Sequence, residues 1–307
     1  MNIVFLGTPE IAKICLEKLY EKRHKILAVV TNPDRPTGRG NKLAESPVKT
    51  FAKSKGLKVL QYESISKEGV NDLKTLKPDA LVLVAFGQIL SEEILSIALP
   101  INLHGSLLPA LRGPSPIQTA ILEGLTQTGV SVMKMEKGVD TGDVLLQKTI
   151  DILPEDTSAT LFDKMAKLGA DALCEALESL EKGSAVWKSQ DHKKATFTKM
   201  LTKENAKLDF NDTAQNIVNK VRAYNPNPVA FFELDSQKFK VFEAKAVKIE
   251  NQGFECGQIA LASAKSGLVI RAKDDFVEII TIQAPNGKKM LAKDFLNGKK
   301  IDVGARV

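Results

Sequence analysis

The sequence predicts an α/β protein with a Rossmann-like, mostly parallel sheet domain followed by a small OB-like β-barrel domain. Short apolar, β-branched runs alternate with amphipathic stretches through the first half, which is typical of a parallel sheet wrapped by helices. Short alternating strands without such helices fill the last third. The length of 307 residues also exceeds the usual size of one domain, which favours two domains.

The first domain is expected over residues 1–187. Residues 79–85 form a nearly continuous apolar run after a proline, as in a central strand covered on both faces. Other strands are predicted at residues 3–6, 26–31, 101–104, 130–135 and 144–149. Apolar residues at helical spacing predict helices at residues 9–21, 47–55 and 157–180. The last of these helices is long and amphipathic, and we expect it to close the domain.

Residues 188–206 are polar and rich in lysine, which is typical of a linker between domains and equally of a solvated face. The barrel domain is expected over residues 207–307. It begins with a helix after Thr213, whose apolar positions include Ile217 and Val221. Its strands are predicted at residues 230–234, 240–248, 257–262, 267–272 and 276–282.

Composition narrows the class of protein. Hydrophobic content of 43% and charged content of 26% are ordinary for a globular protein and exclude a disordered chain or a fibre. The net charge of +6 and the isoelectric point near 9.0 suit a polyanionic partner such as nucleic acid. They serve solubility equally well, so charge alone does not decide between these interpretations.

Three widely separated cysteines, Cys15, Cys174 and Cys256, form neither a CxxC pair nor a Cys/His cluster, so we expect reduced thiols and no metal site. The start of the chain has no basic region before its apolar run, which disfavours a signal peptide. No apolar run approaches the ~20 residues of a membrane span. We therefore expect a cytoplasmic protein without a membrane partner, most simply a monomer.

The turn after the first strand is where a dinucleotide-binding sheet carries its glycine fingerprint. Gly7 begins such a turn, but Pro9 and Ala12 occupy the other two glycine positions. An NAD site is therefore disfavoured, although the topology alone assigns no ligand.

Candidate catalytic residues follow a later strand. Asn102 and His104 have the i, i+2 spacing that places both side chains on one face, where an amide and an imidazole can address one reacting carbonyl. Asp140 lies in a glycine-flanked acidic loop that could approach His104 from a neighbouring strand end. Each motif alone is open to a structural interpretation, as a satisfied histidine or a plain turn.

Together the motifs resemble a known family. Residues 102–109 (Asn-Leu-His-Gly-Ser-Leu-Leu-Pro) and residues 140–143 (Asp-Thr-Gly-Asp) are similar to the signature of formyl-tetrahydrofolate-dependent formyltransferases. Residues 7–10, 32–40, 46–49 and 222–226 further resemble the members that act on methionyl initiator tRNA. The resemblance extends over essentially the whole chain.

The resemblance implies a donor, 10-formyltetrahydrofolate, and a catalytic triad of Asn102, His104 and Asp140. Asn102 and protonated His104 would stabilise the oxyanion of a tetrahedral intermediate, and Asp140 would orient His104 and help to move the proton. Neither a metal nor a covalent enzyme intermediate is required. The resemblance places the folate beside the segment before Asp140 and beside Phe86, Gly87, Gln88, Ile89, Leu90, Ser106, Leu107, Leu108 and Pro109.

The same resemblance implies that a basic loop, residues 33–49, contacts the tRNA acceptor stem. The residues expected to contact the tRNA are Arg35, Arg39 and Lys42, with Arg39 favoured because a guanidinium binds phosphates or base edges bidentately. An exposed basic loop without a partner is the alternative. The lysines of the barrel domain offer a second nucleic-acid platform, although the sequence does not say which of them face RNA.

Three other functions stay open on the sequence. A formyltransferase acting on a small amine or amino sugar would need neither the basic loop nor a basic second domain. A formyl-folate hydrolase would release formate without any acceptor. A tRNA-binding protein with an inert pocket would have a broken triad, and here all three residues are present.

Overall fold

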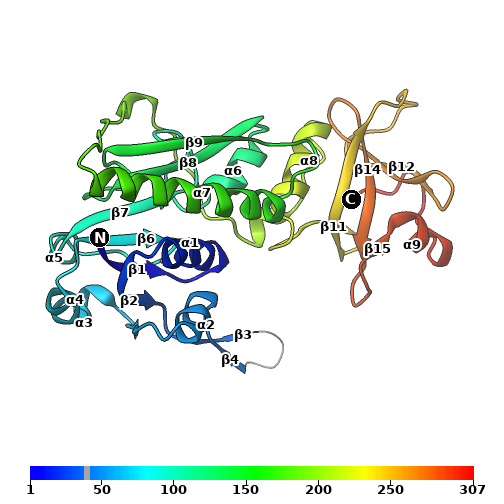
Figure 1. Cartoon of the computed structure of the whole chain (residues 1–307). Helices are drawn as coiled ribbons and strands as arrows, with labels where there is room; N and C mark the ends of the chain where they lie inside the picture. The colour runs from blue at the N-terminus through cyan, green and yellow to red at the C-terminus, as the bar shows by residue number, and fades with distance from the viewer. Residues whose placement is uncertain (38–41) are drawn as a thin grey trace. The chain divides into compact units, whose positions relative to one another are not determined.

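The computed structural model describes residues 1–37 and 42–307, which divide into two compact units. Unit 1 comprises Met1–Pro116, Thr128–Ile150 and Phe162–Thr198, and unit 2 comprises Ile117–Gln127, Asp151–Leu161 and Lys199–Val307. Each unit contains its own sheet (Figure 1). A sheet rich in parallel strands is followed by a separate antiparallel sheet, which confirms the predicted fold class.

The sheet of unit 1 has seven strands. In spatial order they are β5 (Val59–Gln61), β2 (Lys25–Thr31), β1 (Asn2–Gly7), β6 (Ala80–Val84), β7 (Leu99–His104), β8 (Gln127–Lys134) and β9 (Val144–Asp151). The pairs from β5 to β7 are parallel, whereas β7 and β8 are antiparallel. Because parallel strands end at the same edge, the residues that follow β1, β6 and β7 meet there.

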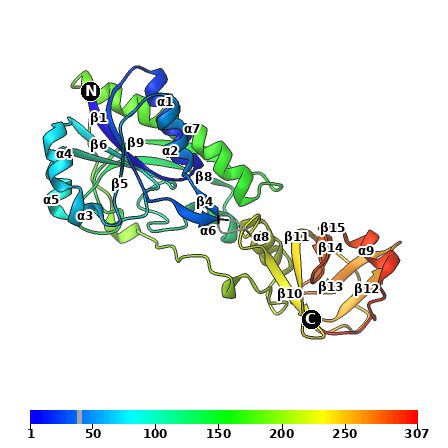
Figure 2. The same ribbon diagram turned by 90° about the horizontal axis from the view of Figure 1, so that it is seen from below.

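Helices cover both faces of this sheet. They are α1 (Glu10–Glu21), α2 (Pro47–Ser54), α3 (Ile65–Glu68), α4 (Val70–Leu76), α5 (Glu92–Leu95) and α7 (Ser158–Glu181), with a 3₁₀ turn η1 (His192–Lys194). In Figure 2, α1, α2 and α7 lie on one side of the sheet, and α3, α4 and α5 lie on the other. Every residue of β6 is therefore buried, which explains its continuous apolar run.

Two helices begin at serine caps. The hydroxyl of Ser46 accepts a hydrogen bond from the amide of Lys49 at 3.1 Å, and Pro47 fills the first turn of α2. Ser91 accepts from Ile94 at 3.3 Å and starts α5 in the same way. This cap fixes the chain directly after residues 86–90, which were predicted to contact folate.

Several short elements were not predicted. β3 (Arg35–Thr37) and β4 (Lys42–Ala44) pair antiparallel at the base of the basic loop. The helices α3 and α5 contain only four residues each, too few to show a 3.6-residue period in the sequence.

Unit 2 contains a six-stranded sheet. Its strands are β10 (Ala230–Leu234), β11 (Gln237–Val247), β14 (Phe276–Gln283), β13 (Gly267–Arg271) and β12 (Ile259–Ser263) in spatial order, with β15 (Met290–Leu291) on β14. Its helical segments are α6 (Pro116–Leu122), η2 (Glu204–Ala206), α8 (Ala214–Ala223) and α9 (Ala292–Gly298). The strand pairings among β10 to β15 are antiparallel, and the ring of Phe232 stacks on that of Phe239 with centroids 5.4 Å apart.

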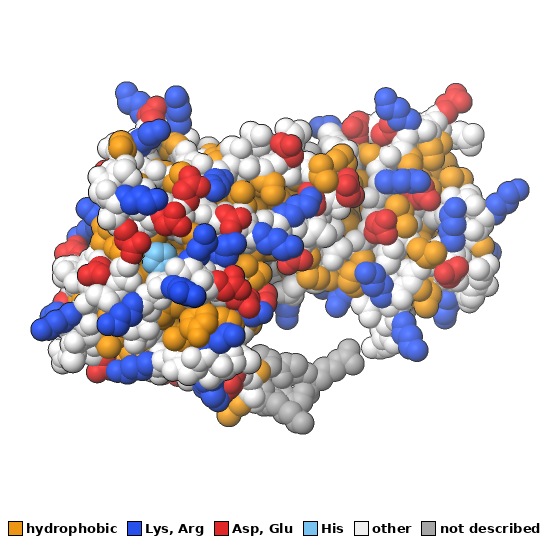
Figure 3. Space-filling model, viewed as in Figure 1, with side chains coloured by type: hydrophobic (Ala, Val, Ile, Leu, Met, Phe, Trp, Pro, Cys, Tyr) orange, Lys and Arg blue, Asp and Glu red, His pale blue; other side chains and the backbone are white. Residues whose placement is uncertain are grey.

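Charged side chains are interspersed on the surface. On the face shown in Figure 3, Lys and Arg alternate with Asp and Glu over both units. The positive net charge is therefore not gathered into one continuous field on this face.

Candidate active site

Two polar side chains end strand β7 at the carboxyl edge of the parallel strands. Asn102 is 8% exposed and His104 is 6% exposed. The antiparallel register sets Asn102 opposite Met133 and His104 opposite Ser131 of β8. Asn102 and His104 thus lie two residues apart on one strand, as their spacing predicted.

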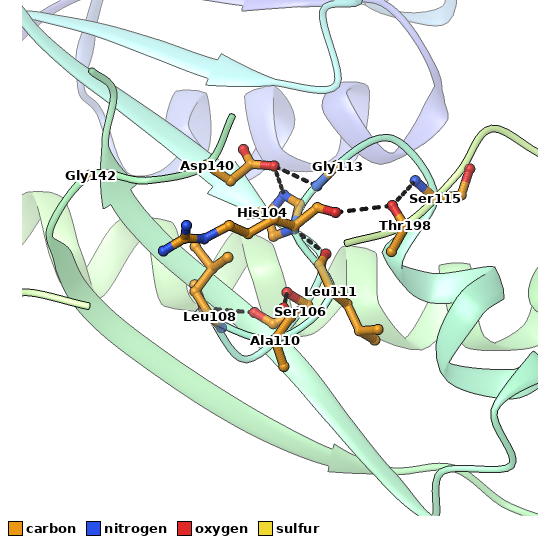
Figure 4. A network of polar contacts seen from close by, with 12 residues as sticks. His104, Ser106, Leu108, Ala110, Leu111, Gly113, Ser115, Asp140, Gly142 and Thr198 are labelled. Carbon is orange, nitrogen blue, oxygen red and sulfur yellow. Dashed lines mark hydrogen bonds and ion pairs between the residues drawn. The ribbon is translucent and has the colours of Figure 1, made fainter. Parts of the chain in front are cut away.

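The imidazole of His104 faces an oxygen at each ring nitrogen (Figure 4). Nε2 lies 3.0 Å from the carbonyl oxygen of Leu111, and Nδ1 lies 3.5 Å from Oδ2 of Asp140. A neutral ring that donates from Nε2 turns a lone pair toward the carboxylate, whereas a doubly protonated ring donates toward both oxygens. The structure therefore brings His104 and Asp140 together in an arrangement that accommodates an imidazolium.

The carboxylate of Asp140 is held from a second side. Its Oδ2 accepts a hydrogen bond from the amide of Gly113 at 2.8 Å, and the side chain is 17% exposed. Asp140 has φ +51°, in the left-handed region that a residue with a Cβ adopts at a cost. At Gly142 a Cβ would lie 2.0 Å from the carbonyl oxygen of Lys134, so this turn requires glycine.

A cavity of about 370 Å³ opens beside these residues in unit 1. Its polar wall includes Asn102 and Asp140, and its apolar wall includes Ile89 and Val139, which are 92% and 59% exposed. His104 is not among the lining residues, but its ring contacts Asp140, which is. The complete lining is Gln88, Ile89, Leu90, Glu92, Leu95, Asn102, Met133, Met135, Glu136, Lys137, Gly138, Val139 and Asp140. A largely apolar cavity with a few polar groups suits a flat ligand with one reactive carbonyl.

A larger cavity, of about 620 Å³, lies in unit 2. It is lined by residues such as Lys207, Glu233 and Arg306, and it contains none of the predicted site residues. The smaller cavity combines an amide and a carboxylate with a nearby imidazole, and this combination marks it as the candidate active site despite its size.

The segment after β6 contributes part of the predicted folate contacts. Gln88, Ile89 and Leu90 line the cavity, whereas Phe86 is 1% exposed in the core and Gly87, with φ +81°, turns the chain. The amide nitrogen of Gln88 donates to Oδ1 of Asn32 at 2.8 Å and to the carbonyl of Tyr62 at 2.9 Å. Gln88 thus anchors the segment in addition to bordering the cavity.

The other predicted folate contacts, residues 106–109, do not line this cavity. Ser106 is fully buried, and its hydroxyl donates to the carbonyl of Ala110 at 2.6 Å. Leu107 is absent from the lining, and Leu108 and Pro109 border a separate cavity of about 400 Å³. In this structure the residues shape the turn between His104 and Leu111.

The predicted tRNA contacts lie at the basic loop. Arg35 is exposed and pairs with Glu63 at 2.8 Å, and Lys42 begins β4, whereas Arg39 lies outside the described residues. Lys49 donates to Asp34 at 2.6 Å, and this hydrogen bond raises the pKa of Lys49 and lowers the pKa of Asp34. Lys49 is therefore held in an ion pair with Asp34 at the base of the loop.

Residues 1–37 and 42–307 contain neither a metal-binding cluster of side chains nor a membrane-spanning helix. Within that part of the chain, no three His, Cys, Asp or Glu side chains come close enough to bind a metal ion. No helix there has the length and apolar character to cross a membrane.

Family models match both units. Residues 1–177 match the family described as "Formyl transferase", and residues 200–300 match "Formyl transferase, C-terminal domain". The chain belongs to the formyl transferase family. Its membership accounts for the presence of both a parallel-rich sheet and a separate antiparallel sheet in one chain.

Relatives in this family extend over the full length. The methionyl-tRNA formyltransferase of Halothermothrix orenii is 41% identical over 315 residues, which cover 100% of this chain and 100% of the relative. The methionyl-tRNA formyltransferase of Fusobacterium nucleatum is 37% identical over 310 residues, again with 100% of both chains covered.

Solved structures share the fold at lower sequence identity. The N-formyltransferase from Helicobacter canadensis, in complex with folinic acid and dTDP-3-aminofucose, is 18% identical with a TM-score of 0.68, covering 90% of this chain and 98% of that one. HypX from Aquifex aeolicus, in complex with tetrahydrofolic acid, is also 18% identical, with a TM-score of 0.66. That match covers 99% of this chain and 50% of HypX, so this chain spans half the length of HypX.

Sequence reasoning missed several residues of the site. Met133 and Met135 line the cavity. They stand two residues apart at and just beyond the end of β8, a spacing that could have predicted that both face the same side as Asn102. Leu111 and Gly113 bind His104 and Asp140 through backbone groups, which leave no trace in side-chain chemistry. Gln190 lies 50 positions from Asp140 and donates to its carbonyl, a contact that only the fold reveals.

Proposed function

We propose that this formyl transferase moves the formyl group of 10-formyltetrahydrofolate to the free α-amino group of methionyl initiator tRNA. The observation that carries the proposal is that Asn102 and Asp140 line one largely apolar cavity, with the ring of His104 against Asp140. Support for the acceptor comes from relatives over 100% of the chain that are named methionyl-tRNA formyltransferase.

The folate donor is proposed to occupy the cavity. Ile89, Leu90 and Val139 offer apolar contact to a flat pterin ring, and Asn102 and Asp140 supply polar groups in the same cavity. Two solved relatives have a folate in their structures, tetrahydrofolic acid in HypX and folinic acid in the Helicobacter canadensis enzyme. The formyl group would then sit within reach of the amide of Asn102.

The reaction requires one bond to form and one to break. The free amine attacks the formyl carbon, the bond between that carbon and the folate nitrogen breaks, and one proton passes from the amine to the folate nitrogen. Asn102 donates a hydrogen bond to the oxyanion of the tetrahedral intermediate, a contact commonly worth about 3 kcal/mol. His104, charged beside Asp140, adds positive potential at the same oxygen.

Asp140 is proposed to handle the proton. Its Oδ2 is engaged by Gly113 and His104, and the residue itself borders the cavity. The carboxylate can therefore accept the amine proton, directly or through a water molecule, and return it to the leaving nitrogen. The imidazolium stabilises the carboxylate form of Asp140 before the first transfer and after the second.

The tRNA is proposed to contact the basic loop through Arg35, Arg39 and Lys42. Replacing Arg39 with Ala should raise the KM for tRNA and leave the KM for the folate unchanged, because a guanidinium binds phosphates or base edges bidentately. Steady-state kinetics with each substrate varied in turn check this expectation. An unchanged KM for tRNA would remove the loop from the proposed interface.

We also propose that the enzyme acts as a monomer in the cytoplasm. Cys15 and Cys174 are buried free thiols. Burial raises the pKa of Cys174 to about 11 and raises the pKa of Cys15 as well, so both stay protonated at neutral pH. Such thiols suit a reducing compartment.

The test is a transfer assay with competing acceptors. Purified protein and 10-formyltetrahydrofolate are incubated with methionyl initiator tRNA, uncharged initiator tRNA, methionyl elongator tRNA, a nucleotide-linked amino sugar, or no acceptor. The proposal predicts rapid formylation of methionyl initiator tRNA alone. Preferential formylation of the amino sugar, or release of formate without an acceptor, would contradict it.

A further inference from the structure

Residues 188–198 lie along the turn that supports the catalytic residues. The amide of Leu111 donates to the hydroxyl of Thr196 at 2.8 Å, and the amide of Arg112 donates to the carbonyl of Thr196 at 2.8 Å. The amide of Thr198 in turn donates to the carbonyl of Arg112 at 2.7 Å. This segment, predicted as part of a linker, therefore braces the turn whose backbone binds His104 and Asp140.

One side chain of this segment joins the two loops of the site. Gln190 is 9% exposed, and its amide nitrogen donates to the carbonyls of Asp140 at 2.9 Å and Gly142 at 2.6 Å. Its amide oxygen accepts from Arg112, at 2.7 Å from Nη2 and 3.2 Å from Nε. All the hydrogen-bonding groups of this amide are thus engaged, between the Asp140 loop and the Arg112 turn.

The backbone held by Gln190 is in a conformation that needs support. Asp140 has φ +51°, which is unfavourable for a residue with a Cβ and persists only where the surroundings fix it. The two carbonyls that accept from Gln190 flank Thr141, directly after this strained position. Loss of both hydrogen bonds would free the loop to relax and to turn the carboxylate away from His104.

The other partner of Gln190 is a buried cation. Arg112 is 3% exposed, and its guanidinium donates to Gln190 and, at 3.1 Å, to Nδ1 of His192. These two acceptors come from residues 188–198, so the same segment binds Nε and Nη2 of the guanidinium and braces the backbone of the Arg112 turn. The backbone of that turn supplies the groups that bind His104 and Asp140.

We infer that Gln190 is a positioning residue for formyl transfer, which fixes the main chain at Asp140 so that the carboxylate faces His104. The inference rests on the proposed function for its kinetic consequence and on geometry alone for its structural consequence. The inference makes residues 188–198 a part of the active site.

Two variants separate the roles of the amide. Gln190→Met keeps the length of the side chain but removes both its hydrogen-bond donors and its acceptor. Gln190→Glu keeps an acceptor for Arg112 but removes the donors to the carbonyls of Asp140 and Gly142. Both should lower kcat by about 10- to 100-fold, the effect of a small misplacement of catalytic groups. The KM values for folate and tRNA should stay near wild type, whereas the midpoint of thermal unfolding should fall in Gln190→Met, because the buried guanidinium of Arg112 loses an acceptor. Full activity of Gln190→Glu would overturn the role assigned to the two donated hydrogen bonds.

The matched control is Gln127→Met. Gln127 is exposed, and its amide donates one hydrogen bond, at 3.2 Å, to Asp151 outside the site. This variant should keep the wild-type kcat. An equal fall in kcat for Gln127→Met and Gln190→Met would overturn the inference, since loss of any glutamine amide would then suffice.

Nuclear magnetic resonance of the histidine rings gives a readout that does not depend on the acceptor. The chain has three histidines, so ¹⁵N-labelled ring signals can be assigned by substitution. Gln190→Met should shift the ring signals of His104 and leave those of His24 in place. Unchanged His104 signals together with unchanged kcat would overturn the inference. If the wild-type enzyme failed to formylate tRNA, the proposed function would fail while the ring signals still decided the role of Gln190.

Discussion

His104 and His24 are both buried imidazoles of unit 1 that face a carboxylate. Nδ1 of His104 lies 3.5 Å from Asp140, and Nδ1 of His24 lies 3.8 Å from Glu181. Their side chains are 7% and 5% exposed. A histidine–carboxylate pair in unit 1 is thus found both inside and outside the candidate active site.

The difference lies in what surrounds each pair. Glu181 also binds the N-terminal ammonium of Met1, and this hydrogen bond lowers the pKa of Glu181. The cavity beside His24 is lined by Glu17, Tyr20, Glu21, Arg23, His24, Phe51 and Lys55, and it includes no amide side chain. Beside His104, in contrast, the amide of Asn102 and an apolar wall share one cavity with the carboxylate. The amide and the apolar wall, rather than the histidine pair, mark the site.

The largest effect should separate the two histidines directly. His104→Ala should lower kcat by about 10³-fold, because it removes both positive potential at the oxyanion and the partner of Asp140. His24→Ala should leave kcat within about twofold of wild type, since His24 has no contact with the cavity of the site. Equal losses in the two variants, measured by formyl transfer to methionyl initiator tRNA, would contradict the distinction.

A smaller loss is expected for Asn102→Ala. Removing one donor to an oxyanion commonly lowers kcat by about 10²-fold. The affinity for folate, measured by fluorescence titration, should change little because the contact strengthens in the transition state. A variant that loses affinity but keeps kcat would show that Asn102 only binds the donor.

The apolar wall should affect binding more than turnover. Ile89 is 92% exposed at the cavity, and Ile89→Ala removes apolar contact worth about 1 kcal/mol, or about a fivefold rise in KM for the folate. Val186→Ala is a suitable control, because Val186 is 66% exposed and does not line the cavity. A fall in kcat without a change in KM would place Ile89 in the chemistry instead of the binding.

The smallest effect concerns stability and belongs to His24. Burial lowers the pKa of His24 below its ordinary value of 6.5, so the unfolded chain binds a proton more readily than the folded chain. Stability is therefore lost as pH falls below about 6.5. Between pH 7.5 and pH 5.5, the melting midpoint should fall less for His24→Gln than for wild type. The difference between the two falls should be under about 4 °C. An identical fall in both proteins would show that other groups govern this range.

The strands of the parallel sheet could be predicted because burial on both faces leaves a direct mark on the sequence. Residues 80–84 are apolar without interruption, and all of them are buried. Short helices such as α3 leave no such mark, since four residues complete barely one turn. The parallel-rich fold was predictable for this reason, and its small connecting elements were not.

The candidate site was predictable only where side chains carry the chemistry. Asn102 and His104 share a strand, so their spacing fixes their relation in advance. The roles of Leu111 and Gly113 depend on a carbonyl and an amide that every such residue possesses. Gln190 lies 50 positions from Asp140 in the sequence, and no local sequence pattern predicts a contact between them.

The central claim is that a formyl group is held beside Asn102 and in front of the His104–Asp140 pair. A crystal structure of the protein with 5-formyltetrahydrofolate, a stable formyl-folate, tests it most directly. The account predicts the pterin ring against Ile89 and Val139, and the formyl oxygen within hydrogen-bonding distance of the Asn102 amide. A folate bound in another cavity, with its formyl group remote from Asn102, would contradict the account.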